Sequence, residues 1–178
     1  MAYGNNQVFA KDVNVLDTTQ LYPLGTTRTV LASQTGKGDQ VWRYVTNAGA
    51  AAWTEGQVVL AVANTAQNLG TGQTATATAS LARNRILGVA QTYVNSAGAV
   101  STFSVGSYGW VLMLGEGSIL NDSAAPLNAD TSFASSSVVA GSVEAAANSG
   151  VGAAAVIGVT HVQIAASTVG SAYITCRP

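Results

Sequence analysis

Short apolar runs separated by polar turns fill most of the chain, and they predict β-strands rather than helices. Between Gln40 and Thr46 the residues alternate with a period of two, which is typical of a half-buried strand. From Gly56 to Ala63 both faces are apolar, which predicts a central strand. Since no window sustains a 3.6-residue period with capping signals, an all-helical fold is excluded.

The chain is organised around residues 83–115, which predict strand, loop, strand, tight turn and strand. A shorter form of the same pattern returns at residues 155–178, so we expect a weak internal repeat. Each copy opens with an apolar strand that carries a glycine inside it, Gly88 in the first and Gly158 in the second. A glycine inside a strand indicates a bulge, a bend or a close backbone contact. The two glycines therefore favour a small barrel or sandwich whose strands bend.

The remaining pattern completes an all-β prediction. Short strands are expected at residues 28–33, 73–80, 137–140 and 171–177, and about ten strands follow one another at roughly ten-residue spacing. Ser142 to Asn148 is the one good helix candidate, with Ser142 as its N-cap and an alanine run behind it. We therefore predict a single β-domain at residues 28–178, a small β-barrel or sandwich with at most one short helix.

Residues 1–27 show neither the 3.6-residue period of a helix nor the two-residue period of a strand. They therefore predict an extended N-terminal arm. Its aromatic residues, Tyr3, Phe9 and Tyr22, are spaced like anchors along a surface. Together with Arg28, at the start of the first strand, they are the candidate partner-contact residues. A frayed terminus is the alternative.

Charge is scarce, and this changes the functional picture. Charged residues make up 8% of the 178 residues, and the net charge is −1, whereas an ordinary soluble domain has about 25% charged residues. Little charge means weak protection against self-association, which favours a protein that works within an assembly. The seven basic residues are scattered, which argues against nucleic-acid binding. The N-terminus lacks a signal-peptide pattern and no apolar run is long enough for a membrane span, so we expect a protein made in the cytoplasm.

Residues for catalysis are few. His161 is the only histidine and lies in a predicted strand, while Cys176 is the only cysteine and alternates with apolar neighbours. A histidine-dependent triad or dyad would need His161 beside its nucleophile. Residues 105–109 approach the G-x-S-x-G pattern, but the first glycine is missing and a strand rather than a helix follows. These features predict a protein that is not an enzyme.

Cofactor and metal motifs are equally sparse. Residues 150–155 match G-x-G-x-x-A, but they follow a polar turn and open a strand, whereas a dinucleotide site opens a helix. The eight acidic residues are well separated in the sequence, and they leave two alternatives. One is a loop calcium site around Asp122 and Asp130, and the other is a pair of glycosidase carboxylates that only the fold would bring together. We expect no cofactor and no metal.

Three segments carry a family resemblance: residues 53–59 (WTEGQVV), 85–90 (RILGVA) and 107–111 (SYGWV). Together with the recurrence at 156–159, they resemble the head decoration, or capsid cement, proteins of tailed bacteriophages, over roughly residues 50–178. The resemblance implies a non-enzymatic protein on the outer surface of the mature head that binds the major capsid protein and stabilises contacts between capsomers. It also implies self-association as a homotrimer, with a dimer as the alternative, and no nucleic-acid or membrane partner.

Two other classes stay open. One is another structural virion protein, such as a tail-tube, fibre or coat subunit. The other is a carbohydrate-binding or adhesin module, in which Trp42, Trp53, Tyr108 and Trp110 would form a sugar-stacking face.

Overall fold

The fold is built almost entirely of β-strands, as the alternating pattern predicts. The computed structural model describes residues 12–62, 70–74, 86–95, 97–122, 125–136, 139–146 and 156–176. Within these residues the strands are β1 (Thr27–Val30), β2 (Gln40–Asn47), β3 (Val58–Ala61), β4 (Thr71–Thr74), β5 (Ile86–Val89), β6 (Tyr93–Val94), β7 (Val100–Ser101), β8 (Tyr108–Leu120), β9 (Ser132–Ser135), β10 (Val143–Ala145), β11 (Val156–Thr160) and β12 (Val169–Thr175). A single helical turn, α1 (Ala32–Thr35), joins β1 to β2. No helix in this part of the chain is long and apolar enough to cross a membrane.

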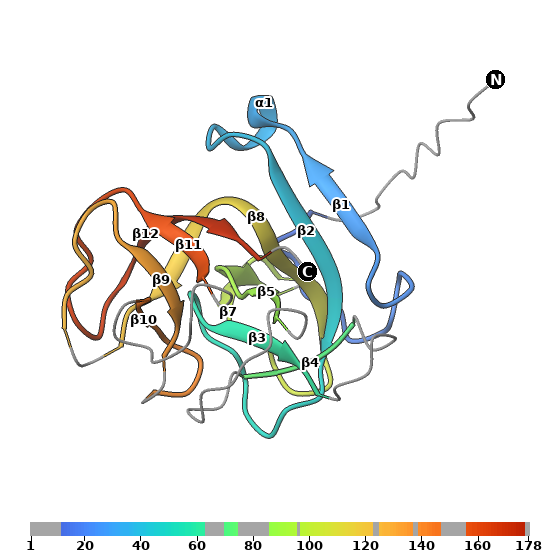
Figure 1. Cartoon of the computed structure of the whole chain (residues 1–178). Helices are drawn as coiled ribbons and strands as arrows, with labels where there is room; N and C mark the ends of the chain where they lie inside the picture. Colours follow the sequence, from blue (N-terminus) through green and yellow to red (C-terminus); the bar gives the residue numbers. More distant parts are fainter. Residues whose placement is uncertain are drawn as a thin grey trace.

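Five strands close into a barrel, which we call the first barrel. Its ring runs β2–β4–β3–β5–β8 and returns to β2. All pairings are antiparallel except β2 with β4, where Thr46 lies opposite Thr71. β1 lies outside this ring, antiparallel to β2 (Figure 1). Closure removes the open edges that a flat sheet would expose.

The long strand β8 also belongs to a second ring. Its N-terminal half pairs with β2, and its C-terminal half, from Leu114 to Leu120, pairs with β12. From β12 the order continues through β11 and β9 to β10. Val143 of β10 then forms a parallel bridge to Asn121, just beyond β8. We call β8–β12–β11–β9–β10 the second barrel; in Figure 1 its strands β9–β12 gather on one side of the molecule, in orange and red.

The two in-strand glycines lie at irregularities of the pairing, which agrees with the expected bend. Beside Gly88, the register of β3 with β5 shifts between Val59 and Leu60. At Gly158, the register of β11 with β9 shifts between Val156 and Gly158. A Cβ atom on Gly88 would lie 2.7 Å from the carbonyl oxygen of Leu112. The absence of a side chain therefore lets neighbouring strands pack closely.

The same backbone hydrogen bonds occur in both barrels. In the first barrel Trp53 and Phe103 exchange two bonds, and Ala90 N donates to Gln57 O. In the second, Leu127 and Ile164 exchange two bonds, and Thr160 N donates to Thr131 O. The parallel pairing that closes each ring also matches. Ala48 N donates to Gly72 O in the first barrel, and Asp122 N donates to Val143 O in the second.

Two apolar cores follow from this arrangement. The smaller one contains Val45, Val59, Leu87 and Val111, one residue from each of four strands of the first barrel. The larger one joins the outer side of the first barrel to the interior of the second barrel. Both faces of β2 are therefore buried over most of its length, and the prediction of a half-buried strand is wrong there. The prediction that β3 is buried on both faces is confirmed.

Two further expectations change. The helix predicted from Ser142 is wrong within the described residues, because Val143–Ala145 pairs with β9. Among the described residues, the one helical turn lies at Ala32–Thr35. The strand predicted at residues 28–33 therefore ends early, at Val30, and its last two residues belong to this turn. Of the strand predicted at residues 73–80, residues 73 and 74 belong to β4 and the rest lies outside the described residues.

Candidate functional site

The arm, from Asp12 to the start of β1, lies against the first barrel. Val15 forms a parallel bridge with Val94, and Asp17 forms an antiparallel bridge with Tyr108. Asp17 N donates to Tyr108 O at 2.8 Å, and Tyr108 N donates to Asp17 O at 2.8 Å. The arm is thus held by backbone hydrogen bonds rather than by side chains alone.

The candidate partner-contact residues are placed as follows. Tyr22 is half-buried, and its ring centroid lies 5.1 Å from Tyr44 and 5.5 Å from Trp110, so it packs on the chain's own core. Arg28 is half-buried on β1, opposite Trp42 in the register. Tyr3 and Phe9 lie outside the described residues. The structure therefore brings Tyr22 and Arg28 to neighbouring parts of the same sheet.

Among the described residues, strand β1 pairs with β2 alone and so offers an open edge. Tyr44 N donates to Thr26 O, so alternate residues after Thr26 direct their backbone groups to β2. Thr27 and Thr29 then direct theirs away from β2, and both residues are exposed. An edge of this kind is a template for strand addition by a partner.

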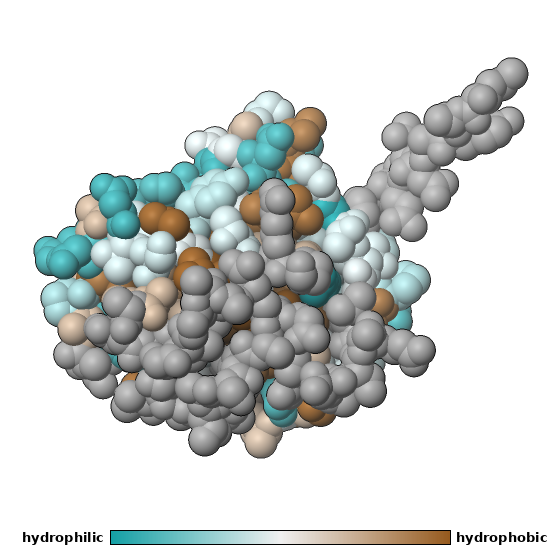
Figure 2. Space-filling view, viewed as in Figure 1, coloured by the Kyte–Doolittle hydropathy of each residue, from teal (hydrophilic) through white to brown (hydrophobic). Residues whose placement is uncertain are grey.

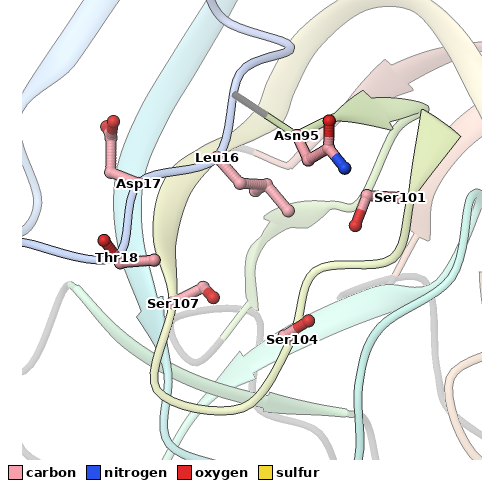
Figure 3. Close-up of a pocket in the computed structure, with 7 residues that line it drawn as sticks. All are labelled: Leu16, Asp17, Thr18, Asn95, Ser101, Ser104 and Ser107. Atoms are coloured by element: carbon pink, nitrogen blue, oxygen red, sulfur yellow. The ribbon is translucent and has the colours of Figure 1, made fainter. Parts of the chain in front are cut away.

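A polar hollow of about 220 Å³ lies where the arm meets the first barrel (Figure 3). Asp17 is buried there and accepts a hydrogen bond from the Tyr44 hydroxyl at 3.4 Å. Burial raises the pKa of Tyr44 to about 12. The lining residues are Leu16, Asp17, Thr18, Asn95, Ser101, Ser104 and Ser107. They offer hydroxyl and amide groups and the Asp17 carboxylate, and none of them is a histidine, a cysteine or a cation.

The residues singled out for chemistry lie apart from this hollow. His161 is exposed, with its ring 6.3 Å from Tyr173. Cys176 is buried, and burial raises the pKa of its thiol to about 12, so it is not a ready nucleophile. Asp122 accepts a hydrogen bond from Ser136 at 2.8 Å, and Asp130 takes a positive φ of 57° in a turn. Across the described ranges, no three His, Cys, Asp or Glu residues are grouped to hold a metal ion.

The tryptophans do not form a sugar-binding face. Trp42, Trp53 and Trp110 are all buried, with exposed fractions of 5%, 0% and 1%. Trp53 packs against Phe103 at a centroid distance of 4.5 Å. On the face seen in Figure 2, the described residues include hydrophilic, intermediate and apolar ones side by side.

The fold is similar to that of a phage capsid protein chain. A chain in the solved structure entitled "The capsid of Myoviridae Phage XM1" superposes with a TM-score of 0.52 and 19% sequence identity. The match covers 98% of this chain and 98% of that chain. No family model and no curated protein matches the sequence. At this identity the comparison establishes a shared fold.

Sequence reasoning missed two buried asparagines that hold the turns of the barrels. Asn47 Nδ2 donates to Ala51 O and to Phe103 O, both at 2.9 Å. Asn121 Nδ2 donates to Ala125 O at 2.9 Å and to Ala165 O at 3.0 Å. Asn47 is the last residue of β2, and Asn121 directly follows β8. Small residues come soon after each asparagine in the sequence, which is the signal that would have paired them.

Proposed function

We propose that the protein is a capsid decoration, or cement, protein of a tailed bacteriophage. It binds the major capsid protein on the outer surface of the mature head and stabilises contacts between capsomers. The observation that carries the proposal is the end-to-end similarity of fold to a chain of the phage XM1 capsid. The resemblance of residues 53–59, 85–90 and 107–111 to decoration proteins supports the more specific role.

The physical character of the chain supports a structural role. With 8% charged residues, the protein can bury surface against a partner at little cost in desolvating charge. The closed barrels give a rigid body, and β1 supplies an edge for a partner strand. Repetition of the contact over many sites on a shell makes a modest affinity per site sufficient.

A coat subunit is the second candidate, since the similar chain belongs to a capsid. Coat subunits are expected to carry a long amphipathic helix, and the described part of this chain holds one helical turn. A carbohydrate-binding module has lost its main support, because the tryptophans it required are buried.

The test is binding to heads. Purified protein is mixed with expanded heads that lack decoration, and bound copies are counted by cryo-electron microscopy. We expect saturating occupancy of symmetry-related positions on the outer surface, by trimers. Occupancy inside the shell lattice would identify a coat subunit, and absence of binding would overturn the proposal. Light scattering of the free protein distinguishes trimer from dimer.

Arg28 provides a matched pair of variants for the same assay. Arg28→Ala removes a cation beside the open edge of β1, and we expect it to lower occupancy of the heads. Lys37→Ala removes an exposed cation from the loop after α1 and serves as the control. If both variants lose the same occupancy of the heads, Arg28 makes no specific contact with the capsid.

A further inference from the structure

A short stretch of the arm acts as an added strand at the start of β8 in the first barrel. Asp17 exchanges two backbone hydrogen bonds with Tyr108, the first residue of β8, and both are 2.8 Å long. On the other side of the arm, Leu16 N donates to Val94 O at 3.2 Å. The first barrel therefore shows how an extended segment binds at this edge.

The start of β12 in the second barrel is equivalent to the start of β8 in the first. The residue before each strand position accepts a hydrogen bond from a buried asparagine: Ser107 O from Asn47 N, and Thr168 O from Asn121 N. Tyr108 therefore corresponds to Val169, the first residue of β12, and Gly109 corresponds to Gly170.

The backbone of Val169 is directed away from β8. Because Thr168 O is bonded to Asn121 N, the next residue turns its N–H and C=O to the opposite side, as alternate residues do in an antiparallel pair. The same two groups of Tyr108 bind Asp17 in the first barrel. Within the described residues, no backbone hydrogen bond reaches Val169 from this side. The edge is therefore open to an added strand.

Burial differs between the two barrels in the way that the arm predicts. Gly109 is buried, and a Cβ atom on it would lie 2.8 Å from Leu16 Cδ2, so the leucine lies directly over this part of β8. Gly170 is only half-buried, and Val169 is 45% exposed. The position that Leu16 covers in the first barrel is therefore accessible to solvent in the second.

The side chain beside this position is apolar. Leu16 and Ser101 line the same hollow in the first barrel (Figure 3). Ser101 stands two residues before Phe103, just as Val162 stands two residues before Ile164, the equivalent of Phe103. Val162 is 54% exposed. An aliphatic side chain in the place of Leu16 would therefore contact a valine in the second barrel.

The chemistry of the open position indicates its occupant. Residues 162–171 carry no charged side chain, so covering them costs little in desolvation. The chain's own arm is already bound at Tyr108, which leaves another polypeptide as the source. We propose that an extended segment of the major capsid protein adds to β12 at Val169 and places an aliphatic side chain between Val162 and Gly170. This inference rests on the proposed function.

The added segment is held on one side only. In the first barrel residues 91–102, which include β6 and β7, provide the second side for the arm, through Val94. In the second barrel the equivalent connection is only residues 161–163. We therefore expect a modest affinity for each copy, which repetition over a shell makes sufficient.

Amide hydrogen exchange of the free protein tests the open edge by itself. The Val169 amide should exchange roughly tenfold faster than the Tyr108 amide, because the latter is bonded to Asp17. Equal protection of the two amides would show that the edge is already covered in the free chain, and the proposal would then be wrong.

A proline variant tests the added strand on heads. Val169→Pro removes the N–H that the segment needs, and proline is tolerated at the first residue of a strand. We expect several-fold lower occupancy of expanded heads at subsaturating protein concentration. Val169→Thr keeps the N–H and the β-branched shape and should bind like the wild type. Equal occupancy by two folded variants, as judged from their melting temperatures, would contradict the proposal.

Photo-crosslinking on decorated heads identifies the occupant and does not depend on the proline variant. Benzoylphenylalanine replaces Val162 or, as the control, Val100, which is 79% exposed on β7 of the first barrel. We expect crosslinks from position 162 to the major capsid protein, and far fewer from position 100. If the heads carry the protein but position 162 crosslinks to another copy of this chain, or to nothing, this inference is overturned while the proposed function stands. Heads that bind no protein would overturn both.

Discussion

Asn47 provides the sharpest test of how the barrels are held together. Its side chain is fully buried and makes three hydrogen bonds to the backbone. Nδ2 donates to Ala51 O and Phe103 O, and Oδ1 accepts from Gly49 N, each at 2.9 Å. Aspartate has nearly the same shape but cannot donate to the two carbonyl oxygens when ionised. Asn47→Asp therefore places a buried charge against two acceptors.

The expected cost is large. A buried charge without compensation destabilises a protein by about 3–5 kcal/mol, a substantial part of the roughly 5–15 kcal/mol that stabilises a typical domain. Urea unfolding at pH 7 should show a midpoint lower by roughly 1.5–2.5 M, for a slope near 2 kcal/mol per M. Asn47→Ala leaves the same backbone groups without partners, at about 1–3 kcal/mol each before relaxation.

Asn95 supplies the matched control. It is exposed, and its Oδ1 accepts from Ala97 N at 2.9 Å and Ala99 N at 3.0 Å. Aspartate keeps both of these bonds, so Asn95→Asp should change stability by less than about 0.5 kcal/mol. If Asn47→Asp unfolds at the same urea concentration as the wild type, or if both aspartate variants lose equal stability, the reasoning is refuted.

Three further predictions concern packing and ionisation. Gly158→Ala should lower the melting temperature strongly in thermal unfolding, because the new Cβ atom would collide with the Phe133 ring and Tyr173 O. Gly98→Ala is the control: its Cβ atom would lie in open space, at a φ of 80°, so the melting temperature should fall much less. Cys176 should stay unreactive towards a thiol reagent at pH 8 until urea unfolds the protein, since burial raises its pKa to about 12; reaction at the rate of a free thiol would contradict its burial. Burial also raises the pKa of Tyr44 to about 12 from 10.0. As the pH rises, the Tyr44 hydroxyl therefore loses its proton in the unfolded state first, and the free energy of unfolding should fall between pH 10 and 12. Tyr44→Phe should reduce this fall. If stability falls with pH as steeply in the variant as in the wild type, the explanation is wrong.

Local pattern was sufficient for the class of fold. The alternation at residues 40–46 and the apolar run at 58–61 correspond to β2 and β3. The glycines at 88 and 158 indicated the bends that closed rings need. These features depend on neighbouring residues, which the sequence displays directly.

Tertiary contacts decided the rest. Alanine-rich residues after Ser142 favour a helix by propensity, but Val143–Ala145 pairs with β9 and the sheet overrides that preference. The sequence predicts a strand that ends near Leu114, yet β8 continues to Leu120 because β12, distant in the chain, pairs with that half. Gly115, at a φ of 115°, permits the close approach to Asp39 O that this course requires.

In the candidate site too, neighbouring residues in the sequence predicted some features, and contacts between distant residues decided the others. The spacing of Tyr3, Phe9 and Tyr22 suggested anchors for a partner, but nothing local in the sequence tells that Tyr22 packs on Tyr44 of its own chain. The tryptophans gave no local sign of their burial either. Which aromatic side chains face solvent depends on how the two barrels pack, and that is set by contacts far apart in the sequence.

The double pairing of β8 limits how this protein can be cut or rearranged. Residues 108–114 form a wall of one barrel, and residues 114–120 form a wall of the other, on a continuous backbone. A gene cut anywhere in this segment leaves one fragment with an incomplete ring. Two autonomous halves would require an additional copy of the strand, so the pair of barrels behaves as one indivisible piece in protein engineering and in evolution.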